Sequence, residues 1–355
     1  MNKIIRGILS PHPRPRTHIR NRRNASSAMT INKVSGIGTL PASNTPYKFL
    51  IIRRLGGIGD VLMTTPMLRG LKEKFPRCHI TYATNDKYAG GSLFAILQGN
   101  PYIDKLITVG ESTQSRYDFT VDVTSIDIEA ENKTKSPPNR IDIYCNYLGV
   151  NPSSYLPFYQ VTSGERAMVN ALLETQVSDL HSKRLIFINP ASNTPRRDVP
   201  IDTIQKTINL LLENEQNEVI VSHHFDHGLS HTRLKKFICD IRTCAALMDR
   251  SDVVLSHDTG TIHLAGALNK KIVGLFGSIN PGARLSHYPN ASAIWKTQLP
   301  CVPCWYANCE RKPQFECMKI ISPREIAQAI EIALSNNIQT QNRVLLPNHI
   351  AGEFV

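Results

Sequence analysis

The first candidate site is the run Gly56-Gly57-Ile58-Gly59-Asp60, which follows a short apolar segment at residues 49–52. Glycines allow a ligand to approach the backbone, and the helix expected after them would present free N–H groups to an anion. Asp60 can accept a proton from an attacking hydroxyl, with the helix terminus keeping it ionised. It would serve equally well as a helix N-cap, and the local sequence leaves both roles open. The glycine order differs from G-x-G-x-x-G and so gives only weak support to a dinucleotide-binding turn.

The second candidate site runs from Ser256 to His263 and lies between a predicted strand and a predicted helix. Asp258 can bind a ribose hydroxyl or cap the helix, while Thr259 and Gly260 can bring N–H groups to a phosphate. The consecutive Ser, His and Asp at 256–258 do not indicate a hydrolytic triad, because neighbours on a strand point to opposite faces. A lone histidine on a helix is more often a core residue, so His263 needs independent support as a ligand.

The third candidate site is the polar loop from Asn189 to Pro200, between another predicted strand and helix. It contains the adjacent pair Arg196 and Arg197. A guanidinium group can donate two parallel hydrogen bonds to phosphate oxygens, so two arginines at the carboxyl end of a parallel strand suit a diphosphate. Without structural context, a solvated surface pair is the stronger interpretation.

Two further clusters contain residue types that bind metals. One comprises His223, His224, His227 and His231; it lacks the H-E-x-x-H spacing and favours loop surface or adventitious metal affinity. The other comprises Cys301, Cys304, Cys309 and Cys317, which could close a tetrahedral zinc or iron site. Its spacing is tighter than that of common two-knuckle ribbons, so packed or redox-idle thiols remain the alternative.

Alternating strands and helices are expected to position these residues. In the first half, strands are predicted at 49–52, 79–83, 105–109 and 119–123, with helices at 60–75, 92–98 and 139–148. After a linking helix at 165–175, strands are predicted at 185–188, 218–222, 253–256 and 271–276, with helices at 201–213, 244–249, 261–268 and 323–333. Short apolar strands alternating with helices are typical of parallel sheets covered on both faces. The chain is therefore predicted to form two similar α/β halves that face each other.

The charge distribution separates an amino-terminal arm from the body. The 355 residues include 41 Lys and Arg and 29 Asp and Glu, for a formal net charge of +12. No acidic residue precedes Asp60, and without the eight Lys and Arg residues before residue 48 the net charge falls to +4. A nucleic-acid-binding domain would carry basic residues and recognition signatures throughout the fold, so no specific nucleic-acid partner is expected.

The arm, residues 1–47, is predicted to be disordered because it is rich in Arg, Ser, Asn and Pro. It lacks the apolar region and cleavage site of a secretory signal, although an organellar transit peptide shares its composition. Other interpretations are contact with anionic lipid, binding of nucleic acid, or an over-long start with Met29 as the true initiator. Residues 336–355 are interpreted as a tail.

Two features bear on location. No apolar run approaches the roughly 20 residues of a membrane-spanning helix, which excludes a multi-pass membrane protein. The eight cysteines lie in a large chain without an export signal, so reduced thiols in a cytosol are expected.

Taken together and in order, four of these segments make the chain resemble glycosyltransferase family nine, the lipopolysaccharide heptosyltransferase family. They are Leu55 to Leu62, Asp258 to Ala267, Val273 to Ser278, and Leu299 to Cys304, and the resemblance covers about residues 48–333. It implies a GT-B fold, an α/β architecture of two Rossmann-like domains whose parallel sheets face a central cleft. The predicted acceptor domain is residues 48–180, and the predicted nucleotide-sugar domain is residues 181–335.

The resemblance also implies an inverting, metal-independent transfer of heptose from ADP-heptose to a lipopolysaccharide-core acceptor, at the cytoplasmic face of the inner membrane. No cofactor is then required, and the basic arm could touch the membrane. By position, Asp60 would be the base and Arg197 would stabilise the leaving phosphate, beside the glycine loop of Gly56, Gly57 and Gly59. The donor-binding set would be Asn189, Asp258, Thr259, Gly260, Thr261 and His263.

Three positions depart from the family pattern and bear on the donor. Arg197 stands where many members have lysine, Val199 replaces a usual tryptophan, and Ser222-His223-His224 replaces a glycine-rich turn. Arginine keeps the charge but changes the geometry. Two alternatives therefore stay open: a transferase that uses another nucleotide-sugar, and a non-catalytic nucleotide-sugar-binding protein of the same fold.

Overall fold

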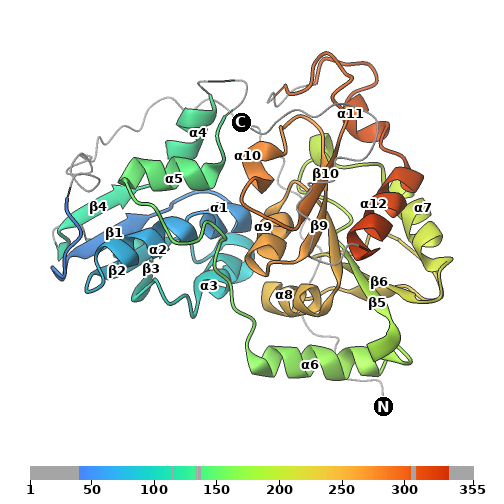
Figure 1. Ribbon diagram of the computed structural model, residues 1–355, viewed down its shortest axis with the longest axis horizontal. Helices are drawn as coiled ribbons and strands as arrows, with labels where there is room; N and C mark the ends of the chain where they lie inside the picture. Colours follow the sequence, from blue (N-terminus) through green and yellow to red (C-terminus); the bar gives the residue numbers. More distant parts are fainter. Residues whose placement is uncertain (1–39, 114–115, 133, 135–136, 305–308, 336–355) are drawn as a thin grey trace. The chain divides into compact units, whose positions relative to one another are not determined.

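The computed structural model describes residues 40–113, 116–132, 134, 137–304 and 309–335. The first of its two sheets has four parallel strands in the order β3-β2-β1-β4 (Figure 1). These strands are β1 (Lys48–Ile52), β2 (His79–Thr84), β3 (Lys105–Thr108) and β4 (Phe119–Asp122). All four lie where the apolar runs predicted them.

The second sheet has six parallel strands in the order β10-β9-β8-β5-β6-β7. They are β5 (Arg184–Ile188), β6 (Asn217–Ser222), β7 (Lys235–Phe237), β8 (Val253–His257), β9 (Lys271–Phe276) and β10 (Ala291–Trp295). The sequence analysis missed β7 and β10, the two edge strands, because edge strands need no continuous apolar run. The predicted α/β class with two parallel sheets is confirmed.

The helices of the first half are α1 (Ile58–Leu62), α2 (Thr65–Lys74), α3 (Ser92–Leu97), α4 (Ile126–Glu131) and α5 (Arg140–Leu148). A linking helix, α6 (Ser163–Glu174), leads to α7 (Ile201–Leu212), α8 (Ile241–Arg250), α9 (Gly260–Ala267), α10 (Gly282–Leu285), α11 (Glu316–Lys319) and α12 (Pro323–Ser335). The single helix expected at 60–75 is wrong: a new helix, α2, begins at Thr65 with Pro66 in its first turn, because proline is tolerated in a first turn but not in a helix interior.

The four inner strands of the second sheet, β5, β6, β8 and β9, are buried on both faces. In β5, Leu185 and Phe187 join a core with α8 and α9, whereas Ile186 and Ile188 join a separate core with α7 and α12. Alternate strand residues point to opposite faces, which explains why these strands read as unbroken apolar runs. This packing holds the carboxyl ends of β5 and β8 side by side, where the functional loops begin.

The start of the described chain differs from the expected arm. Tyr47, assigned to the arm from sequence, packs edge-on against Phe75 and Phe119 with ring centroids 5.4 and 5.3 Å away. Its carbonyl also accepts the N–H of His79 at 2.8 Å. Tyr47 thus packs against the first half of the fold, while residues 1–39 of the predicted arm and the predicted tail fall outside the described residues.

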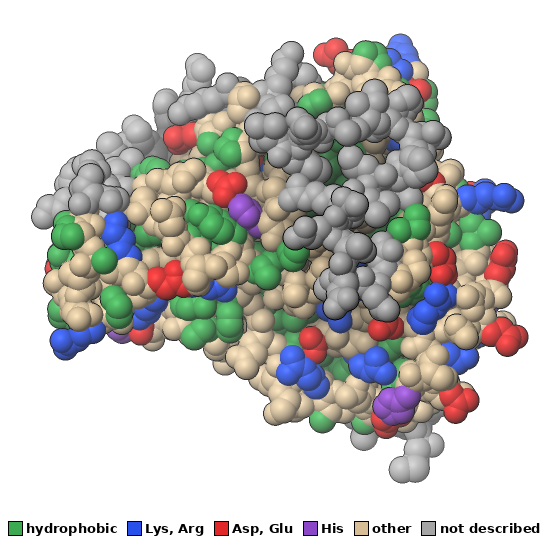
Figure 2. Space-filling model, viewed as in Figure 1, with side chains coloured by type: hydrophobic (Ala, Val, Ile, Leu, Met, Phe, Trp, Pro, Cys, Tyr) green, Lys and Arg blue, Asp and Glu red, His purple; other side chains and the backbone are tan. Residues whose placement is uncertain are grey.

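Two further observations bear on the expected location and partners. Among the helices that could be searched, none is long and apolar enough to cross a membrane. On the face shown in Figure 2, described basic and acidic side chains are interspersed rather than gathered by sign. This distribution agrees with the small net charge predicted for the body.

Candidate active site

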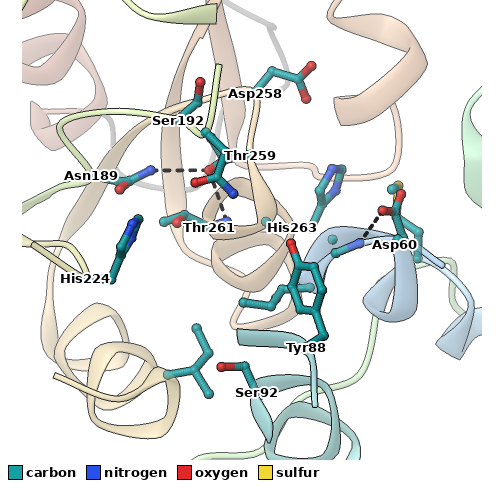
Figure 3. A pocket seen from close by; sticks show the side chains of 18 of the residues that line it. Asp60, Tyr88, Ser92, Asn189, Ser192, His224, Asp258, Thr259, Thr261 and His263 are labelled. Carbon is teal, nitrogen blue, oxygen red and sulfur yellow. Dashed lines mark hydrogen bonds between the residues drawn. The ribbon is translucent and has the colours of Figure 1, made fainter. Parts of the chain in front are cut away.

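A cleft of about 1110 Å³ is lined by residues from both sheets. The loops after β1, β5 and β8 reach it, as expected for the carboxyl ends of parallel strands. In Figure 3, Asp60 and Tyr88 come from the elements of the first sheet, and Asp258, Thr259 and Thr261 come from those of the second. The cleft thus brings together the three candidate sites, which lie far apart in the sequence.

Asp60 is the third residue of α1, and Gly57 is the N-cap. The N-cap role considered for Asp60 is therefore wrong, although its Oδ2 accepts the Gly57 N–H at 2.6 Å and so still stabilises the helix start. Its Oδ1 accepts a bond from Arg140 and lies 3.7 Å from a terminal nitrogen of Arg53. Burial alone would raise the pKa of Asp60, but these two guanidinium groups and the Gly57 N–H outweigh it and lower the pKa. Asp60 is thus held as a carboxylate.

Glycine is required at Gly56 and at Gly59 for two different structural reasons. Gly56 has φ +117°, and a Cβ there would meet Asp60 Oδ2 at 2.7 Å. Gly59 faces α9, where an added Cβ would meet His263 Cδ2 at 2.5 Å and Gly260 Cα at 3.4 Å. The predicted ligand approach is therefore not the only role of this loop: Gly59 and Gly260 let α1 and α9 pack closely across the two halves.

The amino terminus of α9 forms the opposite wall. Thr259 is its N-cap, with Oγ1 accepting the N–H of Thr261 at 3.2 Å and a bond from Asn189 Nδ2 at 3.2 Å. Asp258 is buried, and although burial raises its pKa, Arg197 and Arg284 outweigh this and lower it. Free N–H groups at a helix start can bind an anion, so this wall suits a phosphate.

Arg197 lies in a short 3₁₀ turn, Pro195–Arg197, and is tied to the α9 wall. Its Nη1 donates to the Asp258 carbonyl at 2.8 Å, and its Nε lies 3.8 Å from Asp258 Oδ2. Its side chain is 31% exposed and lines the cleft, so it keeps access to a ligand. Burial and the neighbouring Arg197 lower the pKa of Arg196, and the cleft lining includes Arg197 but not Arg196.

His263 is buried in α9 and still reaches the cleft. Its Nδ1 is 2.7 Å from the Tyr288 hydroxyl, and burial lowers its pKa to about 3. The imidazole is therefore neutral near pH 7. Its hydrogen bond and burial match the core interpretation, while its place in the cleft wall leaves the ligand role as a prediction.

The sequence analysis missed a buried set of charges that links the two walls. Arg140 contacts Asp60 and also Glu131, with Nε 2.6 Å from the carboxylate. Arg284 lies 2.9 Å from the same Glu131 and 3.9 Å from Asp258. A continuous series of ion pairs thus joins Asp60 to Asp258. Arg140, Glu131 and Arg284 lie in no sequence motif, so no local signal could have identified them.

The two metal-type clusters do not form metal sites in the described part of the chain. No group of three or more His, Cys, Asp or Glu side chains there is arranged to hold a metal ion. His223 Nδ1 lies 3.1 Å from His227 Nε2, and burial followed by the neighbouring His224 lowers the pKa of His223 to about 3. In the cysteine cluster, burial raises the pKa of Cys317 to about 11, with the other three thiols adding to the shift. The metal interpretation of the cysteine cluster therefore stays a prediction.

Residues 146–314 match the family described as glycosyltransferase family 9 (heptosyltransferase). Lipopolysaccharide heptosyltransferase 1 of Pseudomonas aeruginosa is 28% identical over 119 residues, a match that spans 30% of this chain and 30% of that protein. The chain thus spans under a third of that curated relative.

Solved structures share the two-sheet fold. A family 9 glycosyltransferase of Veillonella parvula superposes with a TM-score of 0.67 at 16% identity, covering 83% of this chain and 99% of that one. The dodecameric iron-containing heptosyltransferase TibC of Escherichia coli, in complex with ADP-D-beta-D-heptose, superposes with a TM-score of 0.62 at 14% identity, covering 83% and 77%. Because TibC contains iron, the comparisons do not support the expected metal independence. The family 9 match over residues 146–314 and the GT-B fold shared with these structures confirm the resemblance to glycosyltransferase family 9.

Proposed function

We propose that the protein is an inverting glycosyltransferase that moves a heptose from ADP-heptose to a lipopolysaccharide-core-type acceptor. The observation that carries this proposal is the placement of an ionised carboxylate, Asp60, in the same cleft as the α9 amino terminus and Arg197. The first group suits deprotonation and the other two suit a diphosphate. The family 9 match over residues 146–314 and the ADP-heptose bound to TibC support the donor.

The chemistry follows from this arrangement. The acceptor hydroxyl oxygen attacks the anomeric carbon, the bond from that carbon to the diphosphate breaks, and the hydroxyl proton passes to Asp60. Positive charge develops on the sugar and negative charge on the departing phosphates. Thr259 and Gly260 offer N–H groups to those phosphates, and Arg197 offers a guanidinium. Asp60 Oδ2, which accepts the Gly57 N–H, retains a lone pair for the proton.

The remaining assignments belong to the same proposal. Residues 48–180 bind the acceptor and residues 181–335 bind the donor. Transfer needs no added divalent cation, since Arg197 and the α9 amino terminus supply positive charge to the phosphates. The acceptor is a glycolipid at the cytoplasmic face of the inner membrane, which makes the location cytoplasmic. Assays with and without EDTA test the metal, and vesicle sedimentation tests the membrane contact.

The direct test measures ADP-heptose consumption with a heptose-deficient lipopolysaccharide core as acceptor. Asp60→Asn should lower transfer by about 10²- to 10⁴-fold, the usual range for a general base, while ADP affinity stays within a few fold. Asp202→Asn is the matched control, because that carboxylate is 70% exposed and pairs with Lys206 outside the cleft. Full transfer by Asp60→Asn would refute the base, and failure of ADP to bind the wild type would refute the donor.

One observation favours a second candidate, a non-catalytic nucleotide-sugar-binding protein. Asp60 is contacted by Arg53, Arg140 and the Gly57 N–H, so it could serve only to hold α1 in place. In that case ADP-heptose would bind and stabilise the protein, but no acceptor would receive the sugar. Loss of folding in Asp60→Asn, together with undetectable wild-type transfer, would support this candidate.

A further inference from the structure

Two cysteines outside the predicted sites meet at the amino terminus of α8. The sequence analysis placed this helix at 244–249, but it begins at Ile241, because the Asp240 side chain accepts the N–H groups of Arg242 at 2.8 Å and Thr243 at 3.0 Å. With Asp240 as N-cap, Cys239 and Cys244 occupy the positions before the cap and four residues after it. Side chains at these two positions commonly pack together over the first helical turn.

The two thiols lie beside each other next to Ser222. The Ser222 hydroxyl lies 3.4 Å from Cys239 Sγ, and Cys239 and Cys244 are near enough for each thiol to shift the pKa of the other. All three residues line the cleft, and both cysteines are partly exposed. The pair is thus close enough to react internally and open to a small solute.

The two sulfurs also differ in acidity. The hydrogen bond from Cys244, aided by Ser222, lowers the pKa of Cys239 despite its burial. The same interaction, together with burial, raises the pKa of Cys244. By contrast, burial raises the pKa of Cys78 to about 11 and that of Cys145 to about 12. Thiolates are the reactive form, so Cys239 is the natural nucleophile of the pair.

We propose that Cys239 and Cys244 form a redox-active dithiol in the wall of the cleft, converted to a disulfide by hydrogen peroxide. The Cys239 thiolate attacks one peroxide oxygen, the O–O bond breaks, and the released hydroxide takes a proton to leave as water. Cys239 is then a sulfenic acid. The Cys244 sulfur attacks the Cys239 sulfur, the S–O bond breaks, and a second water leaves with the Cys244 proton. Two electrons pass from the thiols to the peroxide, and a dithiol reductant reverses the change.

The disulfide would alter the cleft wall locally. Ser222 loses its thiol partner, and the first turn of α8 is tied to the residue before its cap. That turn also contains Arg242, whose Nη1 donates to the Ala95 carbonyl at 2.9 Å on the other side of the cleft. The proposal does not depend on which sugar or nucleotide the cleft binds.

Peptide mapping of the full-length protein provides the test. Trypsin cleaves after Lys236, Arg242 and Arg250, so residues 237–242 and 243–250 form separate peptides with one cysteine each. After brief peroxide treatment and alkylation, the two peptides should appear linked, lighter by two hydrogens than their sum, and should separate after dithiothreitol. The separately alkylated forms of these two peptides should disappear during peroxide treatment at least about 10-fold faster than the alkylated Cys78 and Cys145 peptides. The reason is that each pKa unit changes the thiolate fraction tenfold. Separate alkylation of both peptides after Cys78 or Cys145 has been oxidised would overturn the proposal.

Two matched variants assign the roles of the sulfurs. In Cys244→Ser, the sulfenic acid on peptide 237–242 has no thiol to resolve it and should be trapped by dimedone. In Cys239→Ser, peptide 243–250 should give no such adduct at the same peroxide dose. Thermal melting and circular dichroism check that both variants fold. Equal trapping in the two variants, or trapping in neither while both fold, would refute the assignment.

Discussion

Glu131 is the carboxylate on which the buried charge network depends, and replacing it tests that network. Its oxygens lie 2.6 Å from Arg140 Nε and 2.9 Å from Arg284 Nη1. Arg284 is only 4% exposed, and without Glu131 its remaining described ion pair is with Asp258 at 3.9 Å. Removing one partner of a buried ion pair costs about 3–5 kcal/mol, because it leaves the other charge uncompensated. Glu131→Gln keeps the size and removes the charge, so we expect a loss near the lower end of that range, about 3 kcal/mol.

The assay is urea unfolding at pH 7 followed by circular dichroism. Asp202→Asn serves as control, since its exposed helical pair with Lys206 contributes only about 0.3–0.5 kcal/mol. The pH dependence gives a second readout. Burial would raise the pKa of Glu131, but Arg140 and Arg284 outweigh it and lower the pKa from 4.5. A carboxyl with a lowered folded-state pKa stabilises the protein above 4.5 and loses that contribution as the pH falls through its folded value. The free energy of unfolding of Glu131→Gln should therefore fall less than that of the wild type as the pH is lowered. Equal urea midpoints for Glu131→Gln and Asp202→Asn at pH 7 would refute the reasoning.

Three further predictions concern the cleft. Gly260→Ala should cost about 1–3 kcal/mol in urea unfolding, because its Cβ would meet Ile58 Cβ at 2.9 Å; Gly164→Ala, with no atom within 4 Å, should be neutral or stabilising. The free energy of unfolding should fall between pH 7 and 5, because His263 in the unfolded chain binds a proton with a pKa near 6.5, whereas the buried imidazole has a pKa of about 3. His263→Gln should reduce this slope by at most about 1.4 kcal/mol per pH unit, and an unchanged slope would contradict the neutral buried imidazole. Arg197→Ala should weaken ADP binding by about 10- to 100-fold in calorimetry, as expected for one charged hydrogen bond, whereas an unchanged affinity would remove Arg197 from the diphosphate site.

The outline of the fold was predictable because strand periodicity is a local property. Residues 49–52, 185–188 and 271–276 are apolar without interruption, and each forms a strand buried on both faces. The edge strands β7 and β10 of the second sheet escaped detection because they are only partly buried and contain no continuous apolar run. The start of α8 was misplaced although its signal, Asp240 as N-cap, is present in the sequence. A cap with one cysteine directly before it and another four residues after it would have indicated both the helix start and the pair of thiols.

The sequence by itself determined the order of strands and helices, the loops that follow β1, β5 and β8, and the family resemblance. These depend on which residues are neighbours along the chain. Only the tertiary structure decided that Arg140 and Glu131 lie between Asp60 and Asp258, and that Gly59 and Gly260 meet. Partners this distant in sequence are brought together by the packing of whole elements, and any buried charge or small residue could have met many others. The chemistry of single residues is therefore local, whereas the pKa and the contacts that tune it belong to the assembled fold.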